Sequence, residues 1–568
     1  MNASTDDGGM PRAGLGARQR TLEYLRLSTS SLRAARPDEA GPLMAGLMAL
    51  ELKDPCRAAE LFAEAIAVAP EDPLCHCLMG RALRALRRPR EALASLERAL
   101  GLWPGYAEAH NQQGHALSEL GLYKFAVLSF TQASRLAPER GEILRSLGEV
   151  LAALEDFKGA SAAFEAALAA DPALPYARGL LLGSRMQLCD WEGLQPALAD
   201  IEARLRHGQR VIPPFTLLTL SDSVELQRLA ARAWYEDHHA CVEPRPGTPD
   251  RRAGKIRIGY FGADFHAHAL MTLLAGLFEH HDRSRFELHA FSFGPRRDDP
   301  MRRRILRCFD HFHEVGQVCE RAIVRLARQA GIDIAVDLSG YTGACRPDIF
   351  ELRAAPVQAA FACYAGTTAS DQIDYLVADA TVVPEDHWPH YSEHVVHLPH
   401  SYLGHDREAA PGPAAGSRSD HGLPATGTIF CCFNSSHKIT PSVFDIWMRI
   451  LGAVDGSVLW LYSRHPQAAA NLRLQAQARH VSPQRLVFAA HAPAAEHLAR
   501  HRLADLFLDT HPYNAHTTAI DALWAGLPVL TCLGSAFAGR AAASALLAAG
   551  LPELVTGTPA EFEHLAVA

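Results

Sequence analysis

Residues 506–528 read LFLDTHPYNAHTTAIDALWAGLP, and this stretch contains the pattern of a strand, a loop and a helix. The apolar run Leu506–Asp509 predicts a buried strand, and Gly526-Leu-Pro528 is a stop signal for the helix that follows the loop. Either His516 or Thr517 is placed to be the N-cap of that helix. Unpaired N–H groups and the helix dipole point outward at such a terminus, so the stretch predicts an α/β fold with an anion site.

Asp521 lies four residues after Thr517, on the same face of the predicted helix. A carboxylate at this position could accept hydrogen bonds from ribose hydroxyls behind a diphosphate at the helix N-terminus. The alternative is an ordinary capped helix with an acidic first turn.

Two further loops follow predicted strands of the same series. Lys438 lies just past the strand Thr428–Phe433, where its compact ammonium would stabilise a leaving diphosphate. Only five of the 55 basic residues are lysine, which sets Lys438 apart, although a solvated loop lysine is the alternative. His497, in the segment Ala492–Arg500 after the strand Leu486–Ala489, could stack on a base or be a solvated helix histidine.

An earlier series of strands leads to a second candidate group. The run Lys255–Gly262 predicts a strand that ends close to Asp264, His266 and His268. A histidine at a strand end is a candidate general base because its pKa lies near working pH. The His266/His268 spacing also suits a metal, but no third ligand is near in sequence, so we predict no metal.

The order of the apolar runs predicts two lobes of parallel sheet. The predicted strands of the first lobe are 255–262, 286–293, 332–338, 357–364, 375–378 and 395–398, with helical stretches such as 322–329 between them. Those of the second are 428–433, 458–462, 486–489, 506–509 and 529–532. A Gly/Pro-rich loop, 404–427, separates two Rossmann-like lobes whose ligands would bind at the carboxyl ends of the strands. The chain contains no P-loop, no G-x-G-x-x-G after the first strand and no D-x-D motif.

The N-terminal third repeats with a period of 34 residues. Glycine recurs at 46, 80, 114 and 148, alanine at 58, 92, 126 and 160, an aromatic or leucine at 62, 96, 130 and 164, and proline at 70, 104, 138 and 172. This pattern resembles four tetratricopeptide repeats, which stack into an α-solenoid with a concave groove. We expect protein or peptide partners to bind in that groove. The alternative is that the repeats are a scaffold or a dimerisation surface, in which case the protein would form a homo-oligomer.

Composition excludes several classes of protein. The 568 residues carry a net charge of −8, with 21% charged and 48% apolar residues, so a nucleic-acid binder with a basic face is not expected. No apolar run suits a membrane span, residues 1–20 lack a signal-peptide core, and the twelve cysteines form no C-x-x-C pair, which favours a reduced cytoplasmic protein. The predicted organisation is a poorly ordered segment 1–38, repeats 39–172, a helical connector 173–250 that includes the breaking linker 243–250, a first lobe 251–410 and a second lobe 425–568.

Several motifs together resemble the protein O-GlcNAc transferase and SPINDLY family and its bacterial members. They are Cys432–Lys438 (CFNSSHK), Leu506–Thr518, Asp521–Gly526 (DALWAG), Asp337–Thr342 (DLSGYT), Arg353–Gln358 (RAAPVQ) and Tyr391–Glu393 (YSE). The resemblance implies a tetratricopeptide-repeat α-solenoid followed by a two-lobed GT-B glycosyltransferase. It further implies inverting, metal-independent transfer of N-acetylglucosamine from UDP-GlcNAc to Ser or Thr hydroxyls, without a cofactor. Family members run on through further helices after the position of residue 568, so either this chain is truncated or its lobe closes differently.

The resemblance also implies a role for each candidate residue. His268 matches the proposed general base, Lys438 the contact to the diphosphate, and Asp521 the contact to ribose. His516, Thr517 and Thr518 would hold the phosphates, His497 would stack on uracil, the backbone of Ala492 would bind the base edge, and Ser435 and Arg500 lie in the same donor-binding segments.

The chain departs from the family pattern at some of these segments. Ser435 and Ala494 stand where animal members carry glutamine and lysine, Ala269 replaces the usual proline after His268, and Ala365–Ala369 reads AGTTA. Three alternatives therefore accompany the main hypothesis: an O-fucosyltransferase with a GDP donor, an N-glucosyltransferase, and a non-catalytic repeat adaptor with a vestigial transferase domain.

Overall fold

The computed structural model describes residues 41–238, 254–362, 364–409, 412 and 416–568. The segments predicted to be a poorly ordered N-terminus (1–38) and a linker (243–250) lie outside these residues. The chain divides into two compact units, residues 1–174 with 317–319 and residues 175–316 with 320–568.

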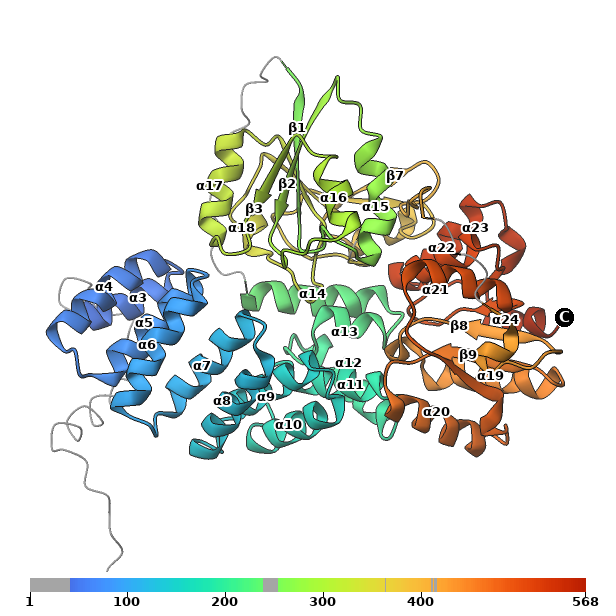
Figure 1. The fold of residues 1–568 in the computed structure, drawn as a ribbon, viewed down its shortest axis with the longest axis horizontal. Coiled ribbons are helices and arrows are strands. Elements are labelled where there is room, and N and C mark those ends of the chain that lie inside the picture. The colour runs from blue at the N-terminus through green and yellow to red at the C-terminus, as the bar shows by residue number, and fades with distance from the viewer. Residues whose placement is uncertain (1–40, 239–253, 363, 410–411, 413–415) are drawn as a thin grey trace, which may run out of the picture. The chain divides into compact units, whose positions relative to one another are not determined.

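The described residues of the first unit, 41–174, form four helix pairs, as the 34-residue period predicts (Figure 1). The pairs are α3 (Pro42–Glu51) with α4 (Pro55–Val68), α5 (Pro73–Ala85) with α6 (Pro89–Leu102), α7 (Ala107–Glu119) with α8 (Tyr123–Leu136), and α9 (Gly141–Ala153) with α10 (Phe157–Ala170). The second helix of each pair ends two residues before the repeated proline, because proline cannot continue the backbone hydrogen bonds of a helix.

Close packing inside each pair explains the repeated glycines. A Cβ added at Gly46, Gly80, Gly114 or Gly148 would lie 2.5–2.8 Å from a side-chain carbon of Phe62, Leu96, Phe130 or Phe164, respectively. Each glycine therefore lets the second helix of its pair lay an aromatic ring or leucine directly on the first helix. The four buried side chains are the centres of the repeat core.

The second unit begins with four helices, in the segment that the sequence predicts only to be a helical connector. They are α11 (Ala177–Gln187), α12 (Leu194–Arg206), α13 (Pro214–Leu218) and α14 (Val224–His238). Their apolar side chains belong to the same core cluster as the second sheet. Trp191 lies between α11 and α12, outside the helix in which its spacing to Leu194 and Leu198 suggested it would be, and its ring centroid lies 5.5 Å from that of Phe444.

The first sheet has seven parallel strands in the order β3-β2-β1-β4-β5-β6-β7. The strands are β1 (Ile256–Gly262), β2 (Phe286–Ser292), β3 (His311–Glu314), β4 (Ile334–Asp337), β5 (Val357–Phe361), β6 (Tyr375–Asp379) and β7 (His394–Leu398). The accompanying helices are α15 (Ala269–Glu279), α16 (Pro300–Leu306), α17 (Glu320–Ala330), α18 (Asp348–Glu351) and the 3₁₀ helix η1 (Glu385–His390). Figure 1 shows α15 and α16 on one face of the sheet and α17 on the other. All six predicted strands are present, whereas β3 was missed because its sequence, HFHE, has no apolar run.

The second sheet has six parallel strands in the order β10-β9-β8-β11-β12-β13. They are β8 (Ile429–Cys432), β9 (Val458–Tyr462), β10 (Leu486–Ala489), β11 (Leu506–Leu508), β12 (Val529–Cys532) and β13 (Val555–Thr556). The α-helices are α19 (Pro441–Ala453), α20 (Pro466–Ala478), α21 (Ala494–Arg500), α22 (Thr517–Trp524), α23 (Ala541–Ala548) and α24 (Pro559–Val567). The 3₁₀ helices are η2 (Arg418–His421), η3 (Ser436–Lys438), η4 (Pro483–Arg485), η5 (His501–Leu503), η6 (Phe537–Gly539) and η7 (Pro552–Leu554). The five predicted strands are confirmed, and the missed strand β13 has only two residues.

Part of the predicted inter-lobe loop 404–427 belongs to the second lobe. Arg418, in η2, forms an ion pair of 2.9 Å with Asp505, and the ring of His421 lies 5.3 Å from that of Trp460. Leu423 is buried in the core of that lobe. Among the described residues, all ten cysteines are free thiols, and no helix is both long and apolar enough to cross a membrane.

Candidate functional site

Three loops meet at the carboxyl edge of the second sheet and carry most of the predicted site residues. They lead from β8 to η3, from β10 to α21 and from β11 to α22. Because all strands of this sheet are parallel, the carboxyl ends of β8, β10 and β11 lie at one edge. The site therefore takes its side chains from segments that are up to about 80 residues apart in the chain.

Asp509 organises the loop between β11 and α22. Its buried carboxylate accepts hydrogen bonds of 2.7 Å from the backbone N–H of Thr510, the backbone N–H of Ala515 and the hydroxyl of Thr531. Burial raises the pKa of Asp509 to about 6, while these donors and the charge of Lys438 act in the opposite direction. The carboxylate thus accepts from two backbone N–H groups of the loop between β11 and α22 that have no partner in a strand or helix.

Asn434 joins this loop to the one that follows β8. Its side-chain N–H donates to the hydroxyl of Thr510 at 2.8 Å and to Asp509 at 3.2 Å. Its side-chain oxygen accepts a hydrogen bond from the hydroxyl of Thr518. Asn434 is fully buried, so these contacts are screened little by water. They hold the start of α22 in a fixed position relative to η3.

The N-terminus of α22 is left open by its own N-cap residue. His516 occupies the N-cap position but makes no side-chain cap, and Thr517 and Thr518 are the first two helical residues. The His516 ring instead lies 3.4 Å from the hydroxyl of Tyr402 and 3.3 Å from the carbonyl oxygen of Ala538. Burial, with the charge of Lys438, lowers the pKa of His516 to about 3, so its ring is neutral. The backbone N–H groups of Ala519 and Ile520 donate to the carbonyl oxygen of His516, so those of Thr517 and Thr518 are the first-turn donors left for an anion.

Lys438 lies at the end of η3, against the loop that precedes α22. Its ammonium donates to the carbonyl oxygen of Asn514 at 2.8 Å and lies 3.8 Å from the ring centroid of Tyr513. Burial lowers the pKa of Lys438 to about 8, with Asp509 acting to raise it. A poorly solvated cation next to an open helix N-terminus is a strong site for a diphosphate. Ser435, three residues earlier, is exposed, and its carbonyl oxygen accepts from the Lys438 backbone N–H at 3.0 Å.

The loop after β10 forms an aromatic wall of the site. The His497 ring contacts the Phe433 ring at 5.4 Å and hydrogen-bonds to the guanidinium of Arg500. Burial lowers the pKa of His497 to about 3, so the ring is neutral and offers a flat aromatic face. Arg500 is buried and donates to the carbonyl oxygen of Ala490 at 2.6 Å, which makes it a support for His497 and for the loop that includes Ala492.

Asp521 faces the segment that connects the two lobes. Its carboxylate lies 4.0 Å from His405 Nε2, and the His405 ring packs at 4.5 Å from the ring of Trp524. Burial raises the pKa of Asp521 to about 7. Hydroxyl groups that donate hydrogen bonds to this side chain would favour its ionised form, because the carboxylate accepts at both oxygens.

His268 belongs to the first lobe. It is the N-cap residue of α15, where its Nδ1 accepts a hydrogen bond of 3.2 Å from the backbone N–H of Leu270 and lies 3.7 Å from the carboxylate of Asp264. Burial lowers its pKa. Helix α15 contacts α22 through Ile520, which packs on the apolar cluster of the first lobe, but His268 itself makes these polar contacts within its own lobe.

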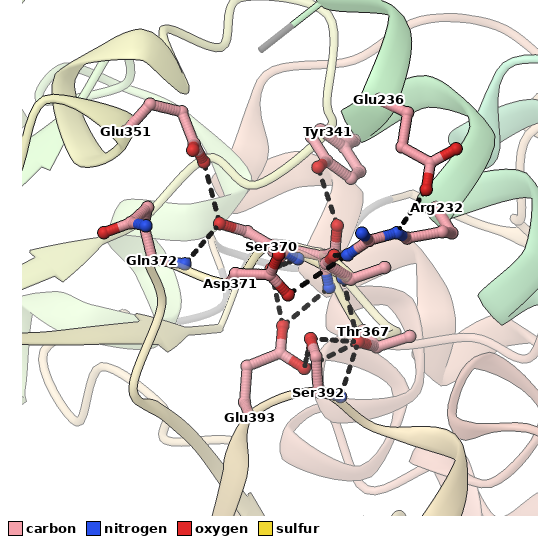
Figure 2. Close-up of polar contacts among 12 residues, drawn as sticks. Arg232, Glu236, Tyr341, Glu351, Thr367, Ser370, Asp371, Gln372, Ser392 and Glu393 are labelled. Carbon is pink, nitrogen blue, oxygen red and sulfur yellow. Dashed lines mark hydrogen bonds and ion pairs between the residues drawn. The ribbon is translucent and has the colours of Figure 1, made fainter. Parts of the chain in front are cut away.

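A rigid loop follows β5 in the first lobe, at the segment Ala365–Ala369 (Figure 2). Buried Glu393 accepts hydrogen bonds from the hydroxyl of Thr367 at 2.6 Å and from the backbone N–H of Thr368 at 2.7 Å. Figure 2 shows three further contacts at this loop and the residues that follow it. The hydroxyl of Tyr341 donates to the carbonyl oxygen of Thr368, and the hydroxyl of Ser370 donates to Glu351. Arg232, from α14, donates to Asp371 at 3.1 Å. Helix α14 of the connector therefore supports this loop of the first lobe.

Three residues hold this site together but are not among those predicted from the sequence, namely Asp509, Asn434 and Tyr402. Asp509 follows directly on the buried strand β11, and Asn434 lies two residues after the buried strand β8. This position at a strand end is the one sequence signal that could have identified them. Tyr402 has no such signal, because its contact to His516 spans 114 residues of sequence.

Comparisons with known proteins find matches that cover both lobes and most of the chain. Residues 242–412 and 407–568 match the family described as glycosyl transferase family 41. The chain is 33% identical over 410 residues to the probable UDP-N-acetylglucosamine–peptide N-acetylglucosaminyltransferase SEC of Arabidopsis thaliana, covering 68% of this chain and 42% of that protein. It is 29% identical over 325 residues to the probable enzyme SPINDLY of the same plant, covering 55% and 35%. A solved structure, a mutant O-GlcNAc transferase of Thermobaculum terrenum, shares 28% identity and a TM-score of 0.63, covering 87% of this chain and 89% of that one. The chain spans less than half the length of these two plant relatives.

Proposed function

Since the chain belongs to glycosyl transferase family 41, we propose that it transfers N-acetylglucosamine from UDP-GlcNAc to serine or threonine hydroxyls of proteins. The observation that carries the proposal is the buried ammonium of Lys438 beside the uncapped N-terminus of α22. The names of the relatives and of the similar solved structure support the choice of donor and acceptor.

In the proposed complex, the donor lies along the carboxyl edge of the second sheet. The diphosphate binds Lys438 and the first turn of α22, at His516, Thr517 and Thr518, because these groups supply charge and hydrogen-bond donors together. Ribose hydroxyls bind Asp521. Uracil stacks on His497 and bonds to the backbone at Ala492, with Arg500 as a support and Ser435 at the exposed rim.

The proposed reaction is a single displacement that inverts the anomeric carbon. The acceptor hydroxyl loses its proton, its oxygen forms the new glycosidic bond, and the bond from the anomeric carbon to UDP breaks. Lys438 and the α22 terminus stabilise the negative charge that develops on the leaving diphosphate. With these positive groups in place, the proposal requires no metal and no cofactor.

We propose His268 as the group that accepts the proton of the acceptor hydroxyl. Its Nδ1 accepts from Leu270, so the neutral ring carries its proton on Nε2 in this arrangement. To act through Nε2 it must move that proton to Nδ1, where the carboxylate of Asp264 at 3.7 Å is the nearest acidic partner. Asp264 is therefore both the positioning group for His268 and the alternative base.

We propose that the acceptor protein binds in the groove of the repeats. The cytoplasmic location stays a prediction. One experiment distinguishes this proposal from the alternatives, which are a different sugar donor, asparagine as the acceptor and a non-catalytic adaptor. A donor panel of UDP-GlcNAc, UDP-glucose and GDP-fucose is incubated with the full chain and acceptor peptides, and modified products are identified by mass spectrometry. Transfer from GDP-fucose, modification of asparagine or no transfer with any donor would each contradict the proposal.

A matched pair of lysine variants tests the observation on which the proposal rests. Lys438→Ala should reduce transfer by about 10²–10³-fold, the usual cost of losing one group that stabilises transition-state charge. Lys124→Ala, at an exposed position of α8, should leave transfer unchanged. Circular dichroism of both variants shows whether the fold is kept. Full turnover of Lys438→Ala would remove Lys438 from the mechanism.

A further inference from the structure

A cluster of three histidines and one carboxylate lies on a face of the first sheet. Glu287 and His289 are two residues apart on β2, and His311 and His313 are two residues apart on β3. Side chains two residues apart on a strand share a face, and His289 is paired with His311 in the register of the two strands. All four side chains therefore project from the same face at the β3 edge.

The geometry of the cluster matches that of a metal site. Glu287 Oε1 lies 3.0 Å from His289 Nε2 and 3.3 Å from His311 Nε2. The three ligand atoms lie within 4.8 Å of one another. In a tetrahedral zinc site with bonds of about 2.0–2.1 Å, neighbouring ligand atoms are about 3.3 Å apart. We propose that Glu287, His289 and His311 bind a divalent transition-metal ion, with Zn²⁺ the best match to two imidazoles and a carboxylate.

His313 supplies the outer support that such a site needs. Its Nε2 lies 3.3 Å from Nδ1 of His289, the ring nitrogen that faces away from Glu287. A metal-binding imidazole usually shares its second nitrogen with a partner that fixes the ring orientation. The His313 ring also stacks on Phe291 at 4.6 Å, which holds it in place. Arg257 Nε, 3.6 Å from Glu287 Oε2, balances the charge of the carboxylate on its other side.

Exposure divides the cluster into a fixed part and an accessible part. The side chain of His289 is 4% exposed, whereas that of His311 is 53% exposed. An ion can therefore enter from solvent past His311 and keep a water molecule as its fourth ligand. Because β3 is a short edge strand without an apolar pattern, a bound metal would fasten it to β2.

This proposed site is separate from the donor site and does not depend on the proposed function. Glu287 is the second residue of β2, near its amino end, whereas the donor loops follow the carboxyl ends of strands in the other sheet. It also differs from the His266/His268 pair, the metal candidate considered in the sequence. The competing explanation is a plain hydrogen-bonded cluster in which the Glu287 carboxylate accepts from two neutral imidazoles.

Titration calorimetry with ZnCl₂ on the full chain, prepared without a histidine tag, tests the proposal. We expect one Zn²⁺ bound per chain and no comparable binding of Mg²⁺, which prefers oxygen ligands. His311→Ala and Glu287→Gln should each weaken Zn²⁺ binding at least tenfold. His280→Ala, an exposed histidine elsewhere in the same lobe, is the matched control and should bind as the native chain does.

A second measurement separates loss of the site from loss of the fold. Zn²⁺ should raise the melting temperature of the native chain and of His280→Ala, but not that of His311→Ala. Because His311 is largely exposed, its replacement should leave the circular dichroism spectrum unchanged, so this variant decides the question even if Glu287→Gln unfolds. Absence of stoichiometric Zn²⁺ binding by the native chain, or native affinity in His311→Ala, would overturn the proposal.

Discussion

Replacing Asp521 by asparagine should stabilise the empty protein while weakening donor binding. The Asp521 side chain is 22% exposed and lies 4.0 Å from Nε2 of His405, and burial raises its pKa from 3.8 to about 7. A raised carboxyl pKa means that the folded chain holds a proton which the unfolded chain releases. Stability is therefore lost as pH rises from about 3.8 to about 7.

The size of this loss follows from the two pKa values. At 1.36 kcal/mol for each pH unit, ionisation of Asp521 costs the folded chain about 4 kcal/mol at pH 8 and about 2 kcal/mol at pH 5. Asparagine has nearly the same shape but does not ionise, so its own burial cost is the same at both pH values. The stability gained by Asp521→Asn should therefore be about 3 kcal/mol larger at pH 8 than at pH 5.

Urea denaturation of the native chain and of Asp521→Asn at pH 5, 6, 7 and 8 measures this difference. Asp298→Asn is the control, because that carboxylate is 85% exposed. Its difference from the native chain should stay constant with pH. In parallel, calorimetry with UDP should show that the native chain binds more tightly as pH rises through about 7, and that Asp521→Asn binds weakly at every pH. A stability difference between Asp521→Asn and the native chain that is independent of pH would refute the reasoning.

Three further outcomes are expected. His268→Ala should lower the transfer rate by about 10²–10⁴-fold, measured as initial rates over pH, and a loss below tenfold would instead favour Asp264 or the donor phosphate. Gly148→Ala should lower the melting temperature, with a cost of about 1–3 kcal/mol, because its Cβ would lie 2.5 Å from the Phe164 ring. Gly101→Ala, whose Cβ would meet nothing within 4 Å, should not lower it, and equal effects of the two changes would contradict the packing argument. Removal of residues 1–172 should impair transfer to protein acceptors more than hydrolysis of the donor, whereas equal loss of both would make the repeats structural only.

Local patterns in the chain were sufficient to predict most of the secondary structure. The 34-residue period predicts the four helix pairs, because each repeat uses the same glycine and aromatic contact. Of the thirteen strands in the described part of the chain, eleven are apolar runs bounded by turn residues, which is a signal contained within a few positions. The two missed strands, β3 and β13, lack that signal, since one alternates histidine with other residues and the other is two residues long.

The candidate site could be predicted only in part. The positions of Lys438 and of Thr517 and Thr518 follow from strand ends and a helix start, which are local features. Their supports do not, since Asn434 bridges 84 residues to Thr518 and Tyr402 bridges 114 to His516. The role of the connector was also missed, because Asp222 and Arg232 contact loops that come much later in the chain.

The sequence by itself determined which segments form helices and strands, and it placed charged and hydroxyl side chains at the ends of particular strands. Only the tertiary structure decided which of those ends meet, because parallel strand order brings β8, β10 and β11 to one edge although they are far apart in the chain. The same applies to the histidines of β2 and β3, which come together as the proposed metal site only through the pairing of the two strands. It also applies to the ionisation of Asp521 and Lys438, since burial, which sets their pKa values, is a property of packing rather than of residue type.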